Sequence, residues 1–343
     1  MRRPRSRRPW LAVLAAALLG PPPASAATEP VRIAGVRHFG DLPTFVADER
    51  GLFARAGLDV QVSWLANGRL ALERLRTGEA DFALTALTPL VLDRLADTAP
   101  NDDDDPVILA SLVQSNRLNR IVTLDDRGIR GPADLRGRRL GLTRGTNAEF
   151  HWWLYARFHG IDPEAVRIVD LQKDTVDEAL AAGRVDAGVL WQPWIARLRG
   201  RVGQRVRVLD GRALYAAHWV LVTRRATAEQ RRHRCAAVLR AYLNAAEAIQ
   251  REPDRALAGF RRALGLPGGA APPEGYPYGF QVHLDWSVLA ALGQQFDWAA
   301  ATGRSPPGPA PSILALVAPA PLTAAAPGAV NVAADLLDAE RTP

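Results

Sequence analysis

The chain has 343 residues, enough for two domains, and it carries a formal net charge of +7 with 48% hydrophobic and 23% charged residues. Five arginines precede residue 27, so the remainder carries a net charge of about +2, which argues against a nucleic-acid-binding protein. A single cysteine excludes an internal disulfide, and no HExxH, GxSxG or phosphate-loop motif occurs. We therefore expect a protein that is not an enzyme and that uses no cofactor or metal ion.

Residues 1–26 have the pattern of a cleaved export signal. A basic start is followed by a short apolar run at Trp10–Leu19, and Ala24-Ser25-Ala26 is a small-residue cleavage site. The apolar run is shorter than the roughly 20 residues that span a bilayer. No cysteine follows the cleavage site, so we expect a periplasmic protein without a lipid anchor. The pair Arg7-Arg8 raises the twin-arginine export route as an alternative to the general one.

The first elements after the signal alternate between strand and helix. Val31–Val36 is predicted to be a strand, and the loop 38–41 leads into a helix that begins near Pro43 and ends at Gly57. Leu58–Leu65 alternates apolar and polar residues, which predicts a second strand with Trp64 on its apolar face. This order is typical of an α/β fold.

One short pattern occurs twice and organises the rest of the chain. Leu75, Gly78 and Asp81 have the same spacing as the triplet Leu180, Gly183 and Asp186. Each triplet indicates a helix end, a glycine stop and a short apolar strand. We expect both aspartates to be structural and to hold the turn through side-chain to backbone bonds. The repeat predicts two similar α/β lobes that face one another.

The remaining periodicity predicts further strands and helices. Residues 107–113, 120–124, 139–143, 166–171 and 219–223 are predicted strands. The helix that starts near Asn147 is expected to bury Phe150, Trp153, Leu154 and Phe158. Residues 228–250 form a predicted long helix whose apolar stripe contains Cys235, which indicates a packed side chain. Residues 284–302 are a predicted late helix.

Polar and aromatic residues gather at the predicted strand ends. Ligands of open α/β sheets bind outside the carboxyl ends of the strands. Such a mixture suits a small amphipathic ligand, and free N–H groups at helix starts suit an anion. The candidate ligand-binding residues are Phe39, Gly40, Asp41, Asn67, Thr85, Thr88, Thr146, Asn147, Gln172, Trp191 and Trp194.

Several candidates have a structural alternative. Thr146 and Asn147 are also suited to cap a helix, and Asp41 is suited to a cap or an exposed loop. The two tryptophans Trp191 and Trp194 could pack in the core instead of lining a cleft. Lys173 is the only lysine in the chain, and it is either a solvated loop residue or a cation for an anionic ligand.

Five segments together resemble the periplasmic substrate-binding proteins of ABC importers of the sulfonate, nitrate and taurine type. They are HFGDLPTFVADERGLFARAGLDVQV, ADFALTALTP, GIRGPADLRGRRLGLTRGTN, LAAGRVDAGVLWQPW and LDWSVLAALGQQFDW. The resemblance implies an α/β periplasmic-binding-protein fold of type 2, with two lobes, each a mixed sheet flanked by helices, and a two-segment hinge. It implies a discontinuous first lobe, residues 27–115 with 220–343, and a second lobe of residues 116–219. The hinge crossings are expected near 114–119 and 216–220.

The same resemblance implies a function and partners. The protein would capture a small anionic solute, such as an organosulfonate, taurine or nitrate, between two closing lobes. It would act as a monomer and deliver the solute to a permease and its ATPase in the inner membrane. A sensor that serves a signalling kinase is one alternative. An enzyme on the same fold is another, although related enzymes use a Cys-rich motif or a Cys nucleophile near the first-lobe cleft, whereas Cys235 lies on a predicted core stripe.

Overall fold

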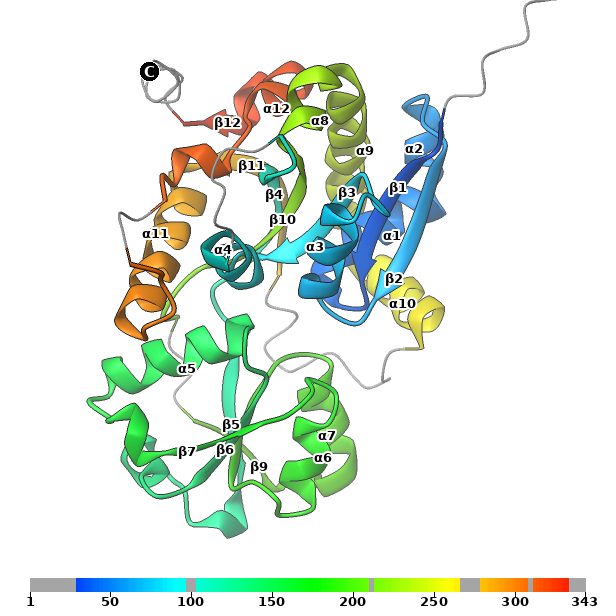
Figure 1. The fold of residues 1–343 in the computed structure, drawn as a ribbon. Helices are drawn as coiled ribbons and strands as arrows, with labels where there is room; N and C mark the ends of the chain where they lie inside the picture. The colour runs from blue at the N-terminus through cyan, green and yellow to red at the C-terminus, as the bar shows by residue number, and fades with distance from the viewer. Residues whose placement is uncertain (1–28, 97–102, 210–212, 266–277, 308–310, 333–343) are drawn as a thin grey trace, which may run out of the picture.

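The computed structural model describes residues 29–96, 103–209, 213–265, 278–307 and 311–332. The predicted export signal, residues 1–26, lies outside the described residues. The chain forms two α/β bodies, one above the other in Figure 1. We call the body with the seven-stranded sheet the first lobe and the body with the five-stranded sheet the second lobe. No helix within the described ranges is long and apolar enough to cross a membrane.

The first sheet takes its strands from both ends of the described chain. Its order is β12-β11-β4-β10-β3-β1-β2. Strand β1 pairs in parallel with β2 and β3, whereas β10 runs antiparallel to β3 and β4, so the sheet is mixed. The strands are β1 (Val31–Val36), β2 (Val60–Leu65), β3 (Phe82–Ala86), β4 (Pro106–Ser115), β10 (Ala217–Arg224), β11 (Gly279–Asp285) and β12 (Val330–Asn331).

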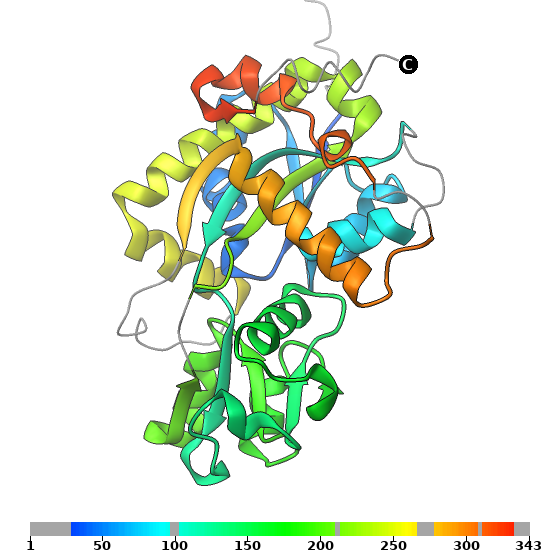
Figure 2. The same ribbon diagram turned by 90° about the vertical axis from the view of Figure 1, so that its left-hand side faces the viewer.

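Two groups of helices cover the faces of the first sheet. Helices α1, α9 and α10 pack together on one face, and α4 and α11 pack together on the other (Figures 1 and 2). The helices are α1 (Leu42–Glu49), α2 (Leu52–Arg55), α3 (Gly68–Arg76), α4 (Leu87–Ala96), α8 (Arg225–Gln230), α9 (Arg232–Arg251), α10 (Pro253–Leu264), α11 (Trp286–Ala301) and α12 (Ala320–Ala325). Strands β3, β4 and β10 are buried almost throughout, as expected for strands covered on both faces.

The second sheet has the order β7-β6-β8-β5-β9. Strand β6 pairs in parallel with β7 and β8, and β5 runs antiparallel to β8 and β9. Its strands are β5 (Arg120–Leu124), β6 (Arg139–Leu142), β7 (Arg167–Asp170), β8 (Ala187–Leu190) and β9 (Val206–Leu209). Its helices are α5 (Asn147–Phe158), α6 (Val176–Ala181) and α7 (Trp194–Val202). Helix α5 lies at the end of this lobe that faces the first lobe (Figure 1).

The repeated triplet has the same structural role in both lobes. Gly78 and Gly183 both adopt a left-handed φ of 73°, which glycine reaches without steric cost. Asp81 accepts hydrogen bonds from the backbone N–H (2.9 Å) and guanidinium (2.8 Å) of Arg32, and Asp186 accepts the same two bonds from Arg139 at the same distances. Each aspartate thus ties the turn before its strand to the neighbouring parallel strand. The predicted structural role of both aspartates is confirmed.

Two segments connect the lobes. The first joins β4 to β5 through residues 116–119, and the second precedes β10. The Asn119 amide donates to the Tyr215 hydroxyl at 2.8 Å and to the Asn147 carbonyl at 3.2 Å, so the two connections are bonded to each other and to α5. The second segment of the first lobe was predicted to begin at residue 220. In the structure, residues 217–219 already pair with β4 of the first sheet.

Four predicted elements differ from the structure. The helix predicted from near Pro43 to Gly57 is two helices, α1 and α2, which are separated at Gly51. Helix α5 buries Trp152 and Tyr155, which are not on the predicted stripe of Phe150, Trp153, Leu154 and Phe158, and it leaves Phe158 54% exposed. The helix packs between the second sheet and the first lobe. The predicted long helix 228–250 is two helices that meet at Arg231. The late helix begins at Trp286, because residues 279–285 pair with β4 as strand β11. Cys235 is fully buried, as predicted.

Candidate ligand-binding site between the lobes

The loop after β1 is held rigidly by its own hydrogen bonds. His38 caps the short 3-10 helix η1 (Phe39–Asp41), and its Nδ1 accepts from the Gly40 N–H at 2.9 Å. Gly40 lies so close to the Trp219 indole that an added Cβ would come within 2.6 Å of its ring carbons. The loop therefore needs a glycine for close approach, and it presents His38 at a fixed angle against Trp219.

Asp41 is turned into the first lobe and away from the second. One of its carboxylate oxygens accepts from the Val36 N–H, and the other accepts from the Thr44 hydroxyl at 2.5 Å. Burial raises the pKa of Asp41 to about 7, and the two hydrogen bonds oppose that rise. Asp41 is fully buried and its side chain makes no cap hydrogen bond to α1, so both alternatives, an exposed loop residue and a helix cap, are wrong. Its carboxylate instead holds the loop within the first lobe.

His38 is the centre of an aromatic cluster that draws on both lobes. Its ring stacks on Trp219 with centroids 4.7 Å apart and an interplanar angle of 14°. Trp191, which follows β8 of the second sheet, meets His38 edge-on at 6.0 Å. Tyr278, immediately before β11, meets it edge-on at 6.1 Å from the first lobe. The ends of β1 and β8 therefore face one another across the boundary between the lobes.

Polar atoms in this cluster lack hydrogen-bond partners. Within the described ranges, His38 Nε2, Trp191 Nε1 and the Tyr278 hydroxyl are buried and accept or donate no hydrogen bond. Burial and the nearby Lys173 ammonium lower the pKa of His38 well below its ordinary value, so the ring is neutral. Burial also lowers the pKa of Lys173 to about 8, while Asp174 opposes the fall and Arg37 adds to it.

Three of the candidates act as helix caps or hinge contacts. The Asn67 side chain accepts from the Leu70 N–H at 3.1 Å and caps α3, and the Thr146 hydroxyl accepts from the Ala148 N–H at 3.2 Å and caps α5. Asn147 contacts the connection between the lobes through Asn119. Thr146 therefore caps α5, which is the structural alternative offered for it.

The other candidates are spread around the cluster. Thr85 bonds the Ala86 carbonyl at 3.1 Å, and Thr88 bonds Gln295 of α11 at 2.6 Å. Trp194 is 7% exposed and lies under the Arg197 guanidinium, 4.4 Å from its ring centroid. Phe39 is fully buried against Phe260 and Tyr278, and Gln172 is exposed. Two candidates thus contact the aromatic cluster through their rings: Trp191 contacts His38 from the second lobe, and Phe39 contacts Tyr278 from the first. Gly40 lies against Trp219.

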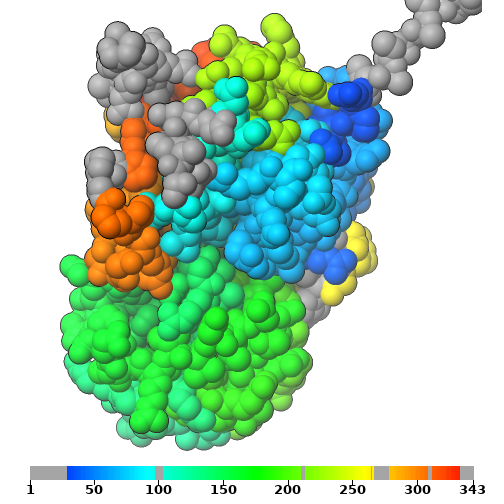
Figure 3. All heavy atoms as spheres, in the orientation of Figure 1, coloured from blue at the N-terminus to red at the C-terminus, as the bar shows by residue number. Residues whose placement is uncertain are grey.

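A second set of contacts joins the lobes at α5 and α11. Glu149 of α5 is buried and accepts from Arg304, which follows α11, at 2.5 Å. Arg144 binds the same carboxylate at 3.0 Å, and the Phe150 and Trp298 rings meet with centroids 5.6 Å apart. Figure 2 shows α11 running toward α5, and in Figure 3 the second lobe directly abuts α11 and the adjoining part of the first lobe. We call Glu149, Phe150, Trp298 and Arg304 the α5–α11 latch.

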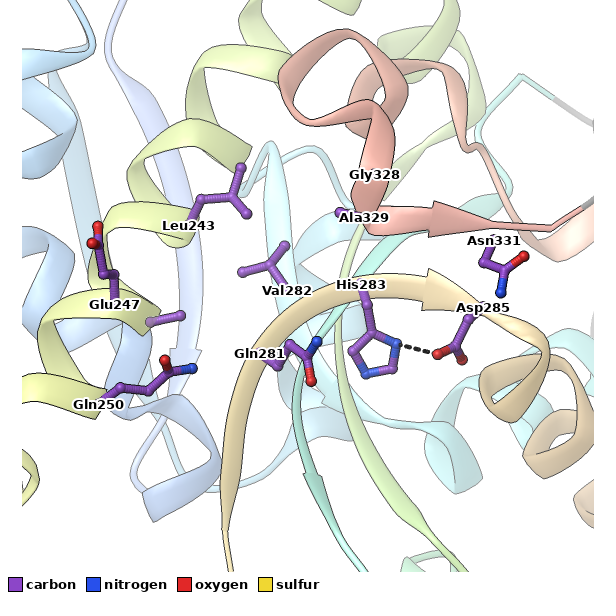
Figure 4. Close-up of a pocket in the computed structure, with 11 residues that line it drawn as sticks. Leu243, Glu247, Gln250, Gln281, Val282, His283, Asp285, Gly328, Ala329 and Asn331 are labelled. Atoms are coloured by element: carbon purple, nitrogen blue, oxygen red, sulfur yellow. Dashed lines mark ion pairs between the residues drawn. The ribbon is translucent and has the colours of Figure 1, made fainter.

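A groove of about 530 Å³ lies elsewhere, entirely within the first lobe. It runs between α9, β11 and the segment before β12, and Nδ1 of its most buried polar member, His283, lies 3.1 Å from the Asp285 carboxylate (Figure 4). It contains none of the candidate residues and receives no side chain from the second lobe. In the part of the chain that the structure describes, no three His, Cys, Asp or Glu residues gather to hold a metal ion.

The aromatic cluster around His38 was not predicted from the sequence. His38 lies in the loop that supplied Phe39, Gly40 and Asp41, but it was not selected. Trp219 and Tyr278 come from distant parts of the chain, and no local pattern links them to residue 38. The position of His38 directly after a parallel strand is the one signal that could have identified it.

Comparison with known proteins gives the family. The sequence profile of the NMT1/THI5 like family matches residues 39–256. A protein of Brucella abortus (strain 2308), provisionally named as a binding protein, is 26% identical over 197 residues, or 57% of this chain and 58% of its own length. An aliphatic sulfonates-binding protein of Bacillus subtilis (strain 168), also provisionally named, is 24% identical over 185 residues, or 52% of this chain and 54% of its own length. The chain thus spans little more than half the length of these curated relatives.

Solved structures show the same fold. The alkanesulfonate-binding protein SsuA from Xanthomonas axonopodis pv. citri, bound to MOPS, superposes with a TM-score of 0.67 at 21% identity, covering 85% of this chain and 97% of its own. The periplasmic aliphatic sulphonate binding protein SsuA from Escherichia coli superposes with a TM-score of 0.70 at 18% identity, covering 84% and 92%. The chain belongs to the NMT1/THI5-like family, and the predicted periplasmic-binding-protein fold is confirmed.

Proposed function

We propose that the protein is the solute-binding subunit of an ABC importer and that it closes its two lobes around a small anionic solute. The main support is the contact between His38, in the loop after β1, and Trp191, which follows β8 of the other sheet, with ring centroids 6.0 Å apart. Two connections bonded through Asn119 and Tyr215 are suited to act as a hinge, and the α5–α11 latch joins the two lobes in the arrangement that the structure has. The relatives and solved structures reported above are named as binding proteins, which supports the same class.

The ligand class, location and partners are part of the proposal. Lys173 favours an anion, and the aromatic cluster favours an apolar body. An organosulfonate fits both features. The export signal predicted at residues 1–26 and the family resemblance support a periplasmic protein that works with a membrane permease and its ATPase.

An enzyme that uses cysteine chemistry is not supported. Cys235 is fully buried in α9, and burial raises the pKa of its thiol to about 12. A thiol that stays protonated and inaccessible cannot act as a nucleophile. This geometry favours the packing role that its position on an apolar stripe predicts.

The proposed function is tested by calorimetric titration with alkanesulfonates, taurine and nitrate. We expect a saturable heat for at least one anion and an increase in Tm on its addition, because a ligand that binds only the folded state stabilises it. The absence of heat and of any Tm shift across anionic, neutral and cationic solutes would overturn the proposal.

A further inference from the structure

The groove between α9 and β11 is large enough for a small organic molecule and is separate from the contact between the lobes. Its volume of about 530 Å³ lies within the range of known ligand pockets. Residues 281–283 of β11 line it. Strand β12 pairs with β11 only at Leu284 and Asp285, so the groove follows the edge of β11 that β12 leaves uncovered.

Carboxylates stand at both ends of this groove (Figure 4). Glu247 projects from α9 at one end, Asp285 lies at the end of β11 at the other, and Val282 is between them. The Glu247 carboxylate pairs with Arg251 one turn along α9, but both side chains are more than half exposed, and such pairs contribute little in water. No lysine or arginine is among the described residues that line the groove. The lining therefore has a negative charge at each end.

Asp285 keeps its negative charge in the folded protein. Burial raises the pKa of its carboxyl, but hydrogen bonds from Ser287 and the neighbouring His283 outweigh that rise, and the pKa is lowered overall. The Ser287 N–H at 2.9 Å and the Ser287 hydroxyl at 2.6 Å both donate to Oδ1. Oδ2 lies 3.1 Å from Nδ1 of His283. One carboxylate oxygen is thus held by the start of α11, and the other lies beside the imidazole that lines the groove.

His283 adds a buried acceptor to the groove. The residue is 6% exposed, and neither ring nitrogen makes a hydrogen bond within the described ranges, although buried polar groups normally have partners. Burial lowers the pKa of the imidazole and Asp285 opposes the fall, so the ring is neutral, and the Asp285 carboxylate favours the proton on Nδ1. The adjacent His218 ring lies 5.8 Å away and donates no hydrogen bond to it. Nε2 of His283 is therefore an acceptor that lacks a donor.

The lining between the two charges is partly apolar. Leu243, Ala246 and Val282 contribute hydrocarbon surface, and Ala329 adds to it from the segment before β12. A ligand that matches this lining has a cationic N–H donor at each end and a carbon chain between them. The described residues include no set of three His, Cys, Asp or Glu side chains that would favour a metal ion instead.

We propose that the groove is a second ligand site, independent of the proposed solute site between the lobes, and that it binds linear diamines. One ammonium group pairs with Glu247, and the other pairs with Asp285 and donates to Nε2 of His283. The carbon chain covers Leu243 and Val282. A sulfonate is excluded, because it would meet a carboxylate at either end.

Diamines and matched controls test this inference by calorimetry on the protein after export, at low ionic strength. The probes are diaminoalkanes of four, six and eight carbons, the monoamines of the same lengths and the corresponding diols. Glu247→Gln and Asp285→Asn each remove one charge and keep the shape of the side chain, and asparagine can still cap α11. The control is Glu73→Gln in α3, because Glu73 is also exposed and also pairs with an arginine four residues away, Arg69, but lies outside the groove.

We expect a saturable heat for at least one diamine, which should bind roughly tenfold more tightly than its monoamine, the gain expected from a hydrogen bond to a charged group. Glu247→Gln and Asp285→Asn should each weaken that diamine roughly tenfold, and Glu73→Gln should leave its Kd unchanged. The diols should give no saturable heat. The Kd of the diamine should be the same with and without a saturating sulfonate.

The absence of saturable heat from every diamine, a monoamine or diol that binds as tightly as the diamine, or an unchanged diamine Kd in both groove variants would overturn this inference. Competition between diamine and sulfonate would also overturn it, because the diamine would then bind between the lobes. The diamine titrations need no sulfonate, so failure of the proposed function and failure of the groove site are distinguishable.

Discussion

Gly40 illustrates how one residue sets the geometry of the contact between the lobes. An added Cβ would come within 2.6–2.7 Å of three Trp219 ring carbons, closer than real side-chain carbons approach. The ring cannot move freely, because it stacks on His38. The absence of a side chain at residue 40 is therefore what allows the stack to form.

We expect Gly40→Ala to lower the free energy of unfolding by about 1–3 kcal/mol, the usual effect of overpacking. Urea denaturation monitored by tryptophan fluorescence measures this loss. Gly131→Ala is the control, because an added Cβ there meets nothing within 4 Å and the backbone is extended. Equal stability of the two variants would contradict the close contact between residue 40 and Trp219.

Lys173 should make anion affinity depend on pH. Its pKa is lowered to about 8 by burial, with Arg37 adding to the fall and Asp174 opposing it, and the neighbouring His38 stays neutral. An anion binds the protonated form more tightly, so affinity should be constant below about pH 7 and should fall as the pH rises through 8. Titrations with a sulfonate, which stays ionised throughout, measure the profile.

Lys173→Arg provides the control, because the guanidinium keeps its charge over this range. The fall in affinity above pH 8 should disappear in this variant, and Lys173→Gln should weaken binding roughly tenfold at pH 7. A wild-type Kd that is the same at pH 7 and pH 9 would show that Lys173 does not contribute to the anion site.

At the scale of elements, the α5–α11 latch joins the lobes at one side of the cleft. Glu149 accepts from Arg304 of the first lobe and from Arg144 of its own lobe, so removal of Arg304 leaves a buried carboxylate with fewer partners. Contacts made only in the closed state add to ligand affinity, because a ligand must otherwise provide the free energy of closure.

Arg304→Ala should therefore weaken ligand binding about fivefold to tenfold, since it removes an ion pair with a buried carboxylate and a cation–π contact with Trp298. Small-angle scattering without ligand should show a larger radius of gyration. The control is Arg251→Ala, which removes the same charge from an exposed pair with Glu247 in α9. No difference between the two variants would rule out a role for the latch in closure.

The sequence predicts elements best where the signal is local. The repeated triplet identified β3 and β8 together with their preceding turns, because a glycine stop and a bonded aspartate act within a few residues. The burial pattern of α5 was wrong, since a helix packed on two sides has no single apolar stripe. Strand β11 was missed although Phe280, Val282 and Leu284 alternate, because its pairing with β4 is a long-range contact.

The candidate site was predictable only in part, for the same reason. Trp191 could be proposed from its position after β8, but the fold alone brings it to His38, which Trp219 and Tyr278 also contact. Thr146 makes the helix-cap bond that the sequence offered as the alternative to a ligand role. Asn67 makes a similar bond at the start of α3. Local patterns thus located the loops at the cleft, and the structure determined which side chains face one another.

At the scale of the whole molecule, two lobes of similar construction meet through their strand ends, and each provides part of one aromatic cluster. The connections that join them are bonded to each other by Asn119 and Tyr215. The proposed function requires a ligand that contacts both lobes. The groove beside β11 is the alternative ligand site. It is lined largely by polar groups and lies within one lobe, so a ligand bound there would not bridge the lobes.

A crystal structure with the most tightly bound sulfonate tests this claim most directly. We predict ligand density between His38 and Trp191, with its charged group within hydrogen-bond distance of His38 Nε2 and Trp191 Nε1 and with contacts from both lobes. Density in the groove between α9 and β11, or a ligand held by one lobe alone, would contradict the account.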